Sequence, residues 1–172
     1  MRKSICFFSF FAFTVLSFYA CQKDSPIADN LIETDETGYA NVPSNMWSLF
    51  QRFEEEALER GYQIDLKTQE ISAEISEISE EGVAGSCTYG SHDPGHIVID
   101  QTFWNQASDL LKEMVIFHEL GHCSLFRGHT EGSHPNGTCL SIMRSGLEDC
   151  NDNYRVSTRE TYLDELFENA DL

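Results

Sequence analysis

The chain has 172 residues, enough for one domain with a hydrophobic core, and its hydrophobic and charged fractions of 41% and 23% are ordinary for a globular protein. Its charge is unusual, because 11 basic residues stand against 29 acidic ones and the formal net charge is −18. This balance argues against nucleic acid as a partner, since phosphate binding needs a basic surface. An acidic surface that maintains solubility is a simpler interpretation than a field that steers a substrate.

The first 20 residues have the layout of an export signal. Arg2 and Lys3 precede an apolar run over residues 5–20, which is too short and wrongly flanked for a transmembrane helix. Ala20 followed by Cys21 resembles the lipobox of bacterial lipoproteins, and "CQKDS" resembles the start of exported lipoproteins of Bacteroidetes-type bacteria. The resemblance implies that residues 1–20 are a signal peptide and that Cys21 carries the lipid anchor. It places the protein on the cell envelope, at the outer membrane, facing the periplasm or the surface. Ordinary secretion and an uncleaved anchor are the alternatives.

Four further cysteines would meet an oxidising compartment after export. The short loop between Cys139 and Cys150 favours a disulfide there, which leaves Cys87 and Cys123 as the second pair. A zinc ion held by four thiolates is the competing interpretation, but no Cys-x-x-Cys spacing supports it.

Residues 21–43 are polar and acidic without periodicity, which indicates a flexible tether rather than an inhibitory pro-segment. Ser44 opens a helix whose apolar residues recur at helical spacing up to Gly61, a typical stop residue. Residues 62–66 and 69–78 alternate apolar with polar side chains and predict strands with one buried face. Further strands are expected within residues 82–90 and at the apolar run 97–99.

From about residue 105 to residue 127 the pattern predicts one long helix, with Gly128 as its stop signal. A loop follows, and a last helix is expected over residues 157–170, where Ser157 and Glu160 form a capping box. The order of elements predicts a single α+β domain over residues 44–172.

The long predicted helix contains His-Glu-x-x-His. His118 and His122 are four residues apart, so both imidazoles project from one face and can bind the same Zn²⁺. Glu119 lies about 100° around the helix, close enough to take a proton from a zinc-bound water without ligating the metal. The sequence therefore predicts one zinc ion per chain with Glu119 as the general base.

The third ligand is less direct, because His129 lies eleven residues after His118. In a continuous helix His129 would stand about 10.5 Å along the axis from His122, too far for one ion. We therefore expect the helix to stop and the chain to reverse at Gly128, which returns His129 to the metal. The alternatives to His129 as third ligand are His134 and a carboxylate from Glu131, Glu148 or Glu160.

"HELGHCSLFRGH" followed by "SIM" resembles the metzincin clan of zinc peptidases. His118, Glu119 and His122 match the clan motif residue by residue, and Met143 matches the methionine of its Met-turn. The third histidine comes one residue late, and Leu125 and Gly128 occupy the clan's glycine and histidine positions.

The resemblance implies a zincin-like fold: a twisted mixed sheet, an N-terminal helix, a long active-site helix and a C-terminal helix. Residues 97–100 would be the edge strand that pairs with an extended peptide or protein substrate, and Tyr154 and Arg144 are candidates for stabilising the tetrahedral intermediate. The implied function is a zinc metalloendopeptidase in which Glu119 activates the zinc-bound water. The alternatives are a non-catalytic, zinc-containing surface lipoprotein for binding or adhesion, and a zinc amidase acting on cell-wall peptides.

Overall fold

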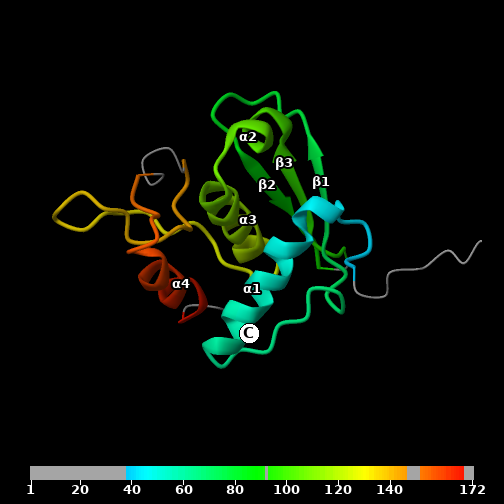
Figure 1. Cartoon of the computed structure of the whole chain (residues 1–172), viewed down its shortest axis with the longest axis horizontal. Coiled ribbons are helices and arrows are strands. Elements are labelled where there is room, and N and C mark those ends of the chain that lie inside the picture. The colour runs from blue at the N-terminus through cyan, green and yellow to red at the C-terminus, as the bar shows by residue number, and fades with distance from the viewer. Residues whose placement is uncertain (1–37, 92, 147–151, 169–172) are drawn as a thin grey trace, which may run out of the picture. The chain divides into compact units, whose positions relative to one another are not determined.

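The computed structural model describes residues 38–91, 93–146 and 152–168 (Figure 1). A 3₁₀ turn, η1, precedes the first α-helix, and three strands and three more helices follow. The elements are η1 (Ser44–Met46), α1 (Trp47–Glu59), β1 (Ser72–Ser76), β2 (Gly85–Thr88), β3 (His96–Asp100), α2 (Gln101–Gln106), α3 (Asp109–Cys123) and α4 (Arg159–Glu168). The predicted α+β class is confirmed.

No helix within these described ranges is both long and apolar enough to cross a membrane. The predicted signal peptide and Cys21 lie outside the described residues, so the lipid anchor stays a prediction.

The three strands form one mixed sheet in the order β1-β3-β2, with β3 parallel to β1 and antiparallel to β2. The prediction that residues 97–100 form the edge strand is therefore wrong, because β3 is central. Ile97 and Ile99 are fully buried, as expected for a strand with neighbours on both sides. The short polar strand β2 is an edge strand of the sheet.

Two other segments differ from the sequence prediction. Residues 62–66 form no strand, and the main-chain N–H of Leu66 donates to the Glu54 carboxylate of α1 instead. The long helix expected over residues 105–127 is two helices. Ala107 is extended, and the Ser108 side chain caps α3 by accepting from the N–H of Leu111.

The folded domain begins before the predicted boundary at residue 44. Tyr39 and Val42 are both buried in the core, and the carbonyl of Asn41 accepts a hydrogen bond from the N–H of Ala73 in β1. The predicted tether therefore ends before Tyr39, and its earlier residues lie outside the described part of the chain.

Helix α3 passes through the core. All residues from 113 to 121 of this helix are buried, which indicates packing on every side rather than on one face. Phe117 of α3 meets Phe53 of α1 edge to face at 5.1 Å, and Phe53 also lies 5.1 Å from Phe167 of α4. These aromatic contacts fix α1 and α4 against the helix that carries the His-Glu-x-x-His motif.

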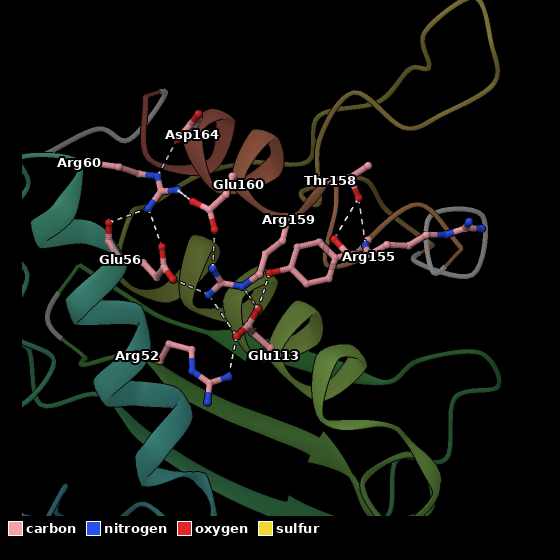
Figure 2. A network of polar contacts seen from close by, with 10 residues as sticks. Arg52, Glu56, Arg60, Glu113, Arg155, Thr158, Arg159, Glu160 and Asp164 are labelled. Carbon is pink, nitrogen blue, oxygen red and sulfur yellow. Dashed lines mark hydrogen bonds and ion pairs between the residues drawn. The ribbon is translucent and has the colours of Figure 1, made fainter.

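A polar network reinforces the same three helices (Figure 2). The buried Glu113 of α3 accepts hydrogen bonds from Arg52 of α1 at 2.7 Å, Arg159 of α4 at 2.6 Å and Tyr154 at 2.6 Å. Burial opposes ionisation of Glu113, but these bonds outweigh it and lower its pKa. Glu160 bonds to Arg60 and Arg159, so its carboxylate serves this network and not the expected capping box.

We expect Glu113→Ala to lower the free energy of unfolding by about 3–5 kcal/mol, because it leaves Arg159 and the Tyr154 hydroxyl without their buried partner. Urea denaturation measures this loss. Glu160→Gln is the matched control, since its side chain is 67% exposed and its pairs contribute about 1 kcal/mol or less. Equal effects of the two substitutions would contradict a structural role for the buried carboxylate.

Candidate metal centre

His118, His122 and His129 lie close together in the structure. One ligand nitrogen from each imidazole falls within a group whose members all lie within 4.8 Å of one another. The Nε2 atoms of His118 and His122 are 3.1 Å apart. This group can hold a metal ion, and within the described residues it contains the three histidines that the sequence indicated.

The chain returns His129 to the site by a different route from the one we predicted. Helix α3 ends at Cys123, and the left-handed residue is Phe126 with φ of 54°, whereas Gly128 does not adopt a positive φ. The N–H of Arg127 then donates to the carbonyl of Gly121 at 2.9 Å. The reversal therefore occurs two residues before the glycine.

Tertiary contacts explain why a bulky residue takes this strained conformation. The Phe126 ring meets Tyr89 at 5.7 Å, at the end of β2. The buried Arg127 guanidinium donates to Glu165 and to the carbonyl of Leu166 on α4. These contacts on both sides hold the segment between the second and third histidines.

Main-chain carbonyls orient two of the imidazoles. The Nδ1–H of His118 faces the carbonyl of Ile142 at 2.5 Å, and the Nδ1–H of His122 faces the carbonyl of Arg127 at 2.7 Å. With Nδ1 donating, Nε2 keeps its lone pair for a metal. Burial lowers the pKa of His118 to about 4 and also lowers that of His122, so both rings are in the neutral, ligating form at neutral pH.

Met143 is fully buried and packs against α3. A Cβ added at Gly121, which lies between the two histidines of α3, would overlap the Met143 sulfur. The Met143 carbonyl accepts from the N–H of Thr130, the residue after His129. Met143 therefore contacts the helix that carries His118 and His122 and is hydrogen-bonded to the residue that follows His129.

Glu119 lies in a cleft that has a volume of about 480 Å³ and is lined by residues 81–87, the three histidines, Glu119, Ser145 and Gly146. The Glu119 side chain is buried, and burial raises its pKa to about 8. Gly85 of β2 lies directly against it, since a Cβ at Gly85 would stand 2.9 Å from Oε1 of Glu119.

The raised pKa gives a signed prediction for the metal-free protein. The folded state binds a proton more tightly than the unfolded state, whose glutamate pKa is about 4.3, so stability falls as pH rises from there to about 8. We expect Glu119→Gln to raise the free energy of unfolding at pH 9 by about 5 kcal/mol, with little change at pH 4. Thermal unfolding of the metal-free proteins at both pH values measures this difference. An equal effect at both pH values would contradict the buried, protonated carboxyl.

Within the part of the chain that the structure describes, strand β2 has a neighbouring strand on one side only, and main-chain groups on its other side are left unpaired by the sheet. The N–H of Asp100 donates to the carbonyl of Ala84, and the register then directs Ser86 and Thr88 toward β3. The N–H and C=O groups of Gly85 and Cys87 therefore point away from the sheet, along its edge.

A disulfide joins edge strand β2 to the end of α3. Cys87 of β2 is bonded to Cys123, the residue after His122, as predicted. Cys139 is disulfide-bonded as well, and its predicted partner, Cys150, lies outside the described residues. The first bridge fixes the distance between the free strand edge and the histidines.

The other candidates from the sequence lie elsewhere. His134 is exposed in the loop after His129, Glu131 accepts from Ser145, and Glu160 belongs to the polar network. Tyr154 donates to Glu113, and Arg144 donates to Ser133, so neither lines the cleft. Glu148 lies outside the described residues.

Gly85 and Arg127 were not predicted from the sequence as residues of the site. Gly85 was readable as a glycine inside an expected strand, which indicates close approach of another group. Arg127 carried a weaker signal, as a cation between two candidate ligands.

No protein-family model matches this chain, and comparisons with curated proteins and with solved structures found no similar protein.

Proposed function

We propose that the protein is a zinc-dependent metalloendopeptidase. The observation that carries the proposal is the histidine cluster with Glu119 beside it, in a cleft bounded by the free edge of β2. A purely structural zinc site needs neither a buried carboxylate nor an open strand edge.

The donor set fits zinc. Neutral imidazole nitrogens are preferred ligands of Zn²⁺, and three protein ligands leave one coordination position for water or substrate, as in catalytic zinc sites. His118 and His122 direct Nε2 inward because their Nδ1 atoms are bonded to carbonyls. When bound, zinc would supply Lewis-acid chemistry, polarising a carbonyl and lowering the pKa of water.

Glu119 is the proposed general base. Its carboxylate accepts a proton from the attacking water and delivers that proton to the leaving amine nitrogen. Burial alone favours the protonated carboxyl, but a cation held by the histidines favours the ionised form at neutral pH.

The peptide is proposed to bind as an added strand. Gly85 and Cys87 offer their main-chain N–H and C=O groups to an extended chain, the recognition mode known as β-augmentation. Antiparallel pairing is the commoner geometry. Because Gly85 has no side chain, the backbone of β2 lies close to the proposed general base Glu119.

The zincin-like fold and metzincin kinship belong to this proposal. The edge strand beside the cleft and Met143 beneath the histidines support them. Anchoring through Cys21 at the cell envelope is proposed on the sequence alone.

One observation favours a non-catalytic zinc lipoprotein. Tyr154 and Arg144, the two residues expected to stabilise a tetrahedral intermediate, are bonded outside the cleft. The intermediate would then need main-chain donors or solvent.

A reconstitution experiment tests the proposal. The purified protein is stripped with a chelator, reloaded with one equivalent of Zn²⁺, and offered a broad peptide library. We expect cleavage after reloading and none after stripping. Cleavage that persists in the stripped protein would refute a zinc mechanism.

We expect Gly85→Ala to lower kcat/KM about 10- to 100-fold while zinc binding is retained, because the new methyl group overlaps Glu119 and displaces the proposed general base. Kinetics on a library-derived peptide and metal analysis measure the two effects. Gly128→Ala is the control, because Gly128 does not line the cleft, its φ is not positive and a Cβ added there meets nothing within 4 Å. An unchanged kcat/KM in Gly85→Ala would show that the close approach of Gly85 to Glu119 has no role in catalysis.

A further inference from the structure

A second cavity joins the cleft at the start of β2. It has a volume of about 420 Å³ and shares Glu81, Gly82, Val83 and Ala84 with the cleft that contains the histidines. The segment 81–84 therefore lines both, and the second cavity lies next to the cleft.

Helix α3 places this cavity close to the reacting position. Val115 and Leu111 line it, and they precede His118 by three and seven residues on the same helix face. They lie about 4.5 and 10.5 Å along the axis from His118. An extended peptide advances about 3.3 Å per residue, so a side chain next to the scissile bond can reach the cavity.

The cavity has an apolar floor and an acidic rim. The floor consists of Ala84, Phe103, Leu111 and Val115, whose side chains belong to or pack against the core. The rim is formed by three exposed glutamates at positions 77, 80 and 81. Asp100 also lines the cavity, but its carboxylate already accepts from the N–H groups of Phe103 and Ile78.

Among residues 38–91, 93–146 and 152–168, no cation forms an ion pair with the rim glutamates. The ion pairs between described residues leave out Glu77, Glu80 and Glu81. The net charge of −18 adds a field that favours cations near this surface. An aliphatic stem with a cationic head matches both parts of the cavity, because lysine and arginine bury their methylenes and keep the charge at the rim.

We propose that this cavity binds a lysine or arginine side chain of the substrate, at the residue that follows the scissile bond. The assignment rests on the proposed peptidase function. A peptide antiparallel to β2 runs from the Thr88 end toward the Gly85 end, so its C-terminal part meets residues 81–84. Glu77, Glu80 and Glu81 thereby determine specificity without touching the reacting atoms.

The test uses three peptides that differ only at that residue, which is lysine, norleucine or glutamate. Norleucine keeps the aliphatic stem and removes the charge. For the zinc-loaded protein we expect kcat/KM to be about tenfold higher for lysine than for norleucine at low salt, and lowest for glutamate. The preference should shrink at high ionic strength, since the rim is exposed.

The triple substitution Glu77→Gln, Glu80→Gln and Glu81→Gln should bring the lysine-to-norleucine ratio of kcat/KM close to one. The matched control replaces three exposed glutamates on α1 and α4 with glutamine, Glu55, Glu59 and Glu168, and should keep the ratio. Equal cleavage of lysine and norleucine peptides by the unaltered protein would overturn the proposal, as would an equal loss of preference in both triple variants.

A binding measurement separates this proposal from the proposed function. Calorimetric titration of the zinc-loaded Glu119→Gln protein with the lysine and norleucine peptides reports the cavity without catalysis. The unaltered protein could cleave neither peptide while the Glu119→Gln protein binds the lysine peptide about tenfold more tightly than the norleucine peptide. In that case the peptidase function fails and the cavity assignment stands. Equal affinities would overturn the assignment whether or not cleavage occurs.

Discussion

Glu119→Gln is expected to lower kcat/KM for peptide hydrolysis by about 10³-fold or more, while the protein still binds one zinc ion. The amide has almost the shape of the carboxyl group but cannot accept the proton of the attacking water, and general base catalysis contributes about 10²- to 10⁴-fold. Glu119 is buried in the cleft beside His118 and is not a member of the histidine cluster. Rates of hydrolysis of one peptide, with the zinc content measured on the same samples, check both the loss of kcat/KM and the retention of zinc.

Glu131→Gln is a suitable control, because this exposed carboxylate binds Ser145 near the cleft without lining it. It should keep kcat/KM within about twofold. Loss of zinc in Glu119→Gln would assign the carboxylate to the metal, and full activity would remove it from the mechanism.

The second large effect is expected from His129→Ala. Removing one of three protein ligands should weaken zinc binding by at least about 100-fold, since even residues that only orient a ligand change affinity about 10- to 100-fold. Zinc at about 1,000 times its dissociation constant should stabilise the unaltered protein by about 4 kcal/mol, and this gain should largely vanish in the variant. Competition with a chromophoric chelator and thermal unfolding with and without zinc measure the two quantities.

His134→Ala is the control for this experiment, since His134 is exposed in the same loop and lies outside the histidine cluster. Its zinc affinity should equal that of the unaltered protein. The opposite result, with His134 required and His129 dispensable, would show that the loop delivers a different ligand.

Local features of the fold were predictable from the sequence. The helix at α1 follows from apolar residues at helical spacing, and β2 and β3 follow from short runs bounded by turn residues. Strand order was not predictable in this way, because the position of β3 between β1 and β2 depends on pairing between distant residues. The break at Ala107 was obscured because the apolar spacing continues across it, although Ser108 is a good capping residue.

The candidate site shows the same division. His118, Glu119 and His122 were readable because their spacing within one helix fixes their geometry. The return of His129 was anticipated, but its mechanism was wrong. Intrinsic preference assigns the left-handed position to glycine, whereas the contacts of Phe126 with Tyr89 and of Arg127 with α4 impose it on a phenylalanine. Such contacts join parts of the chain that no local pattern connects.

The most direct test of the account is a search for new peptide termini by mass spectrometry, after a denatured protein is incubated with the zinc-loaded chain. Glu119→Gln protein with the same zinc content serves as the blank. We expect new peptide termini with the unaltered protein and none above background with the Glu119→Gln protein. A protein that binds one zinc ion through its three histidines but generates no new termini would contradict the peptidase function.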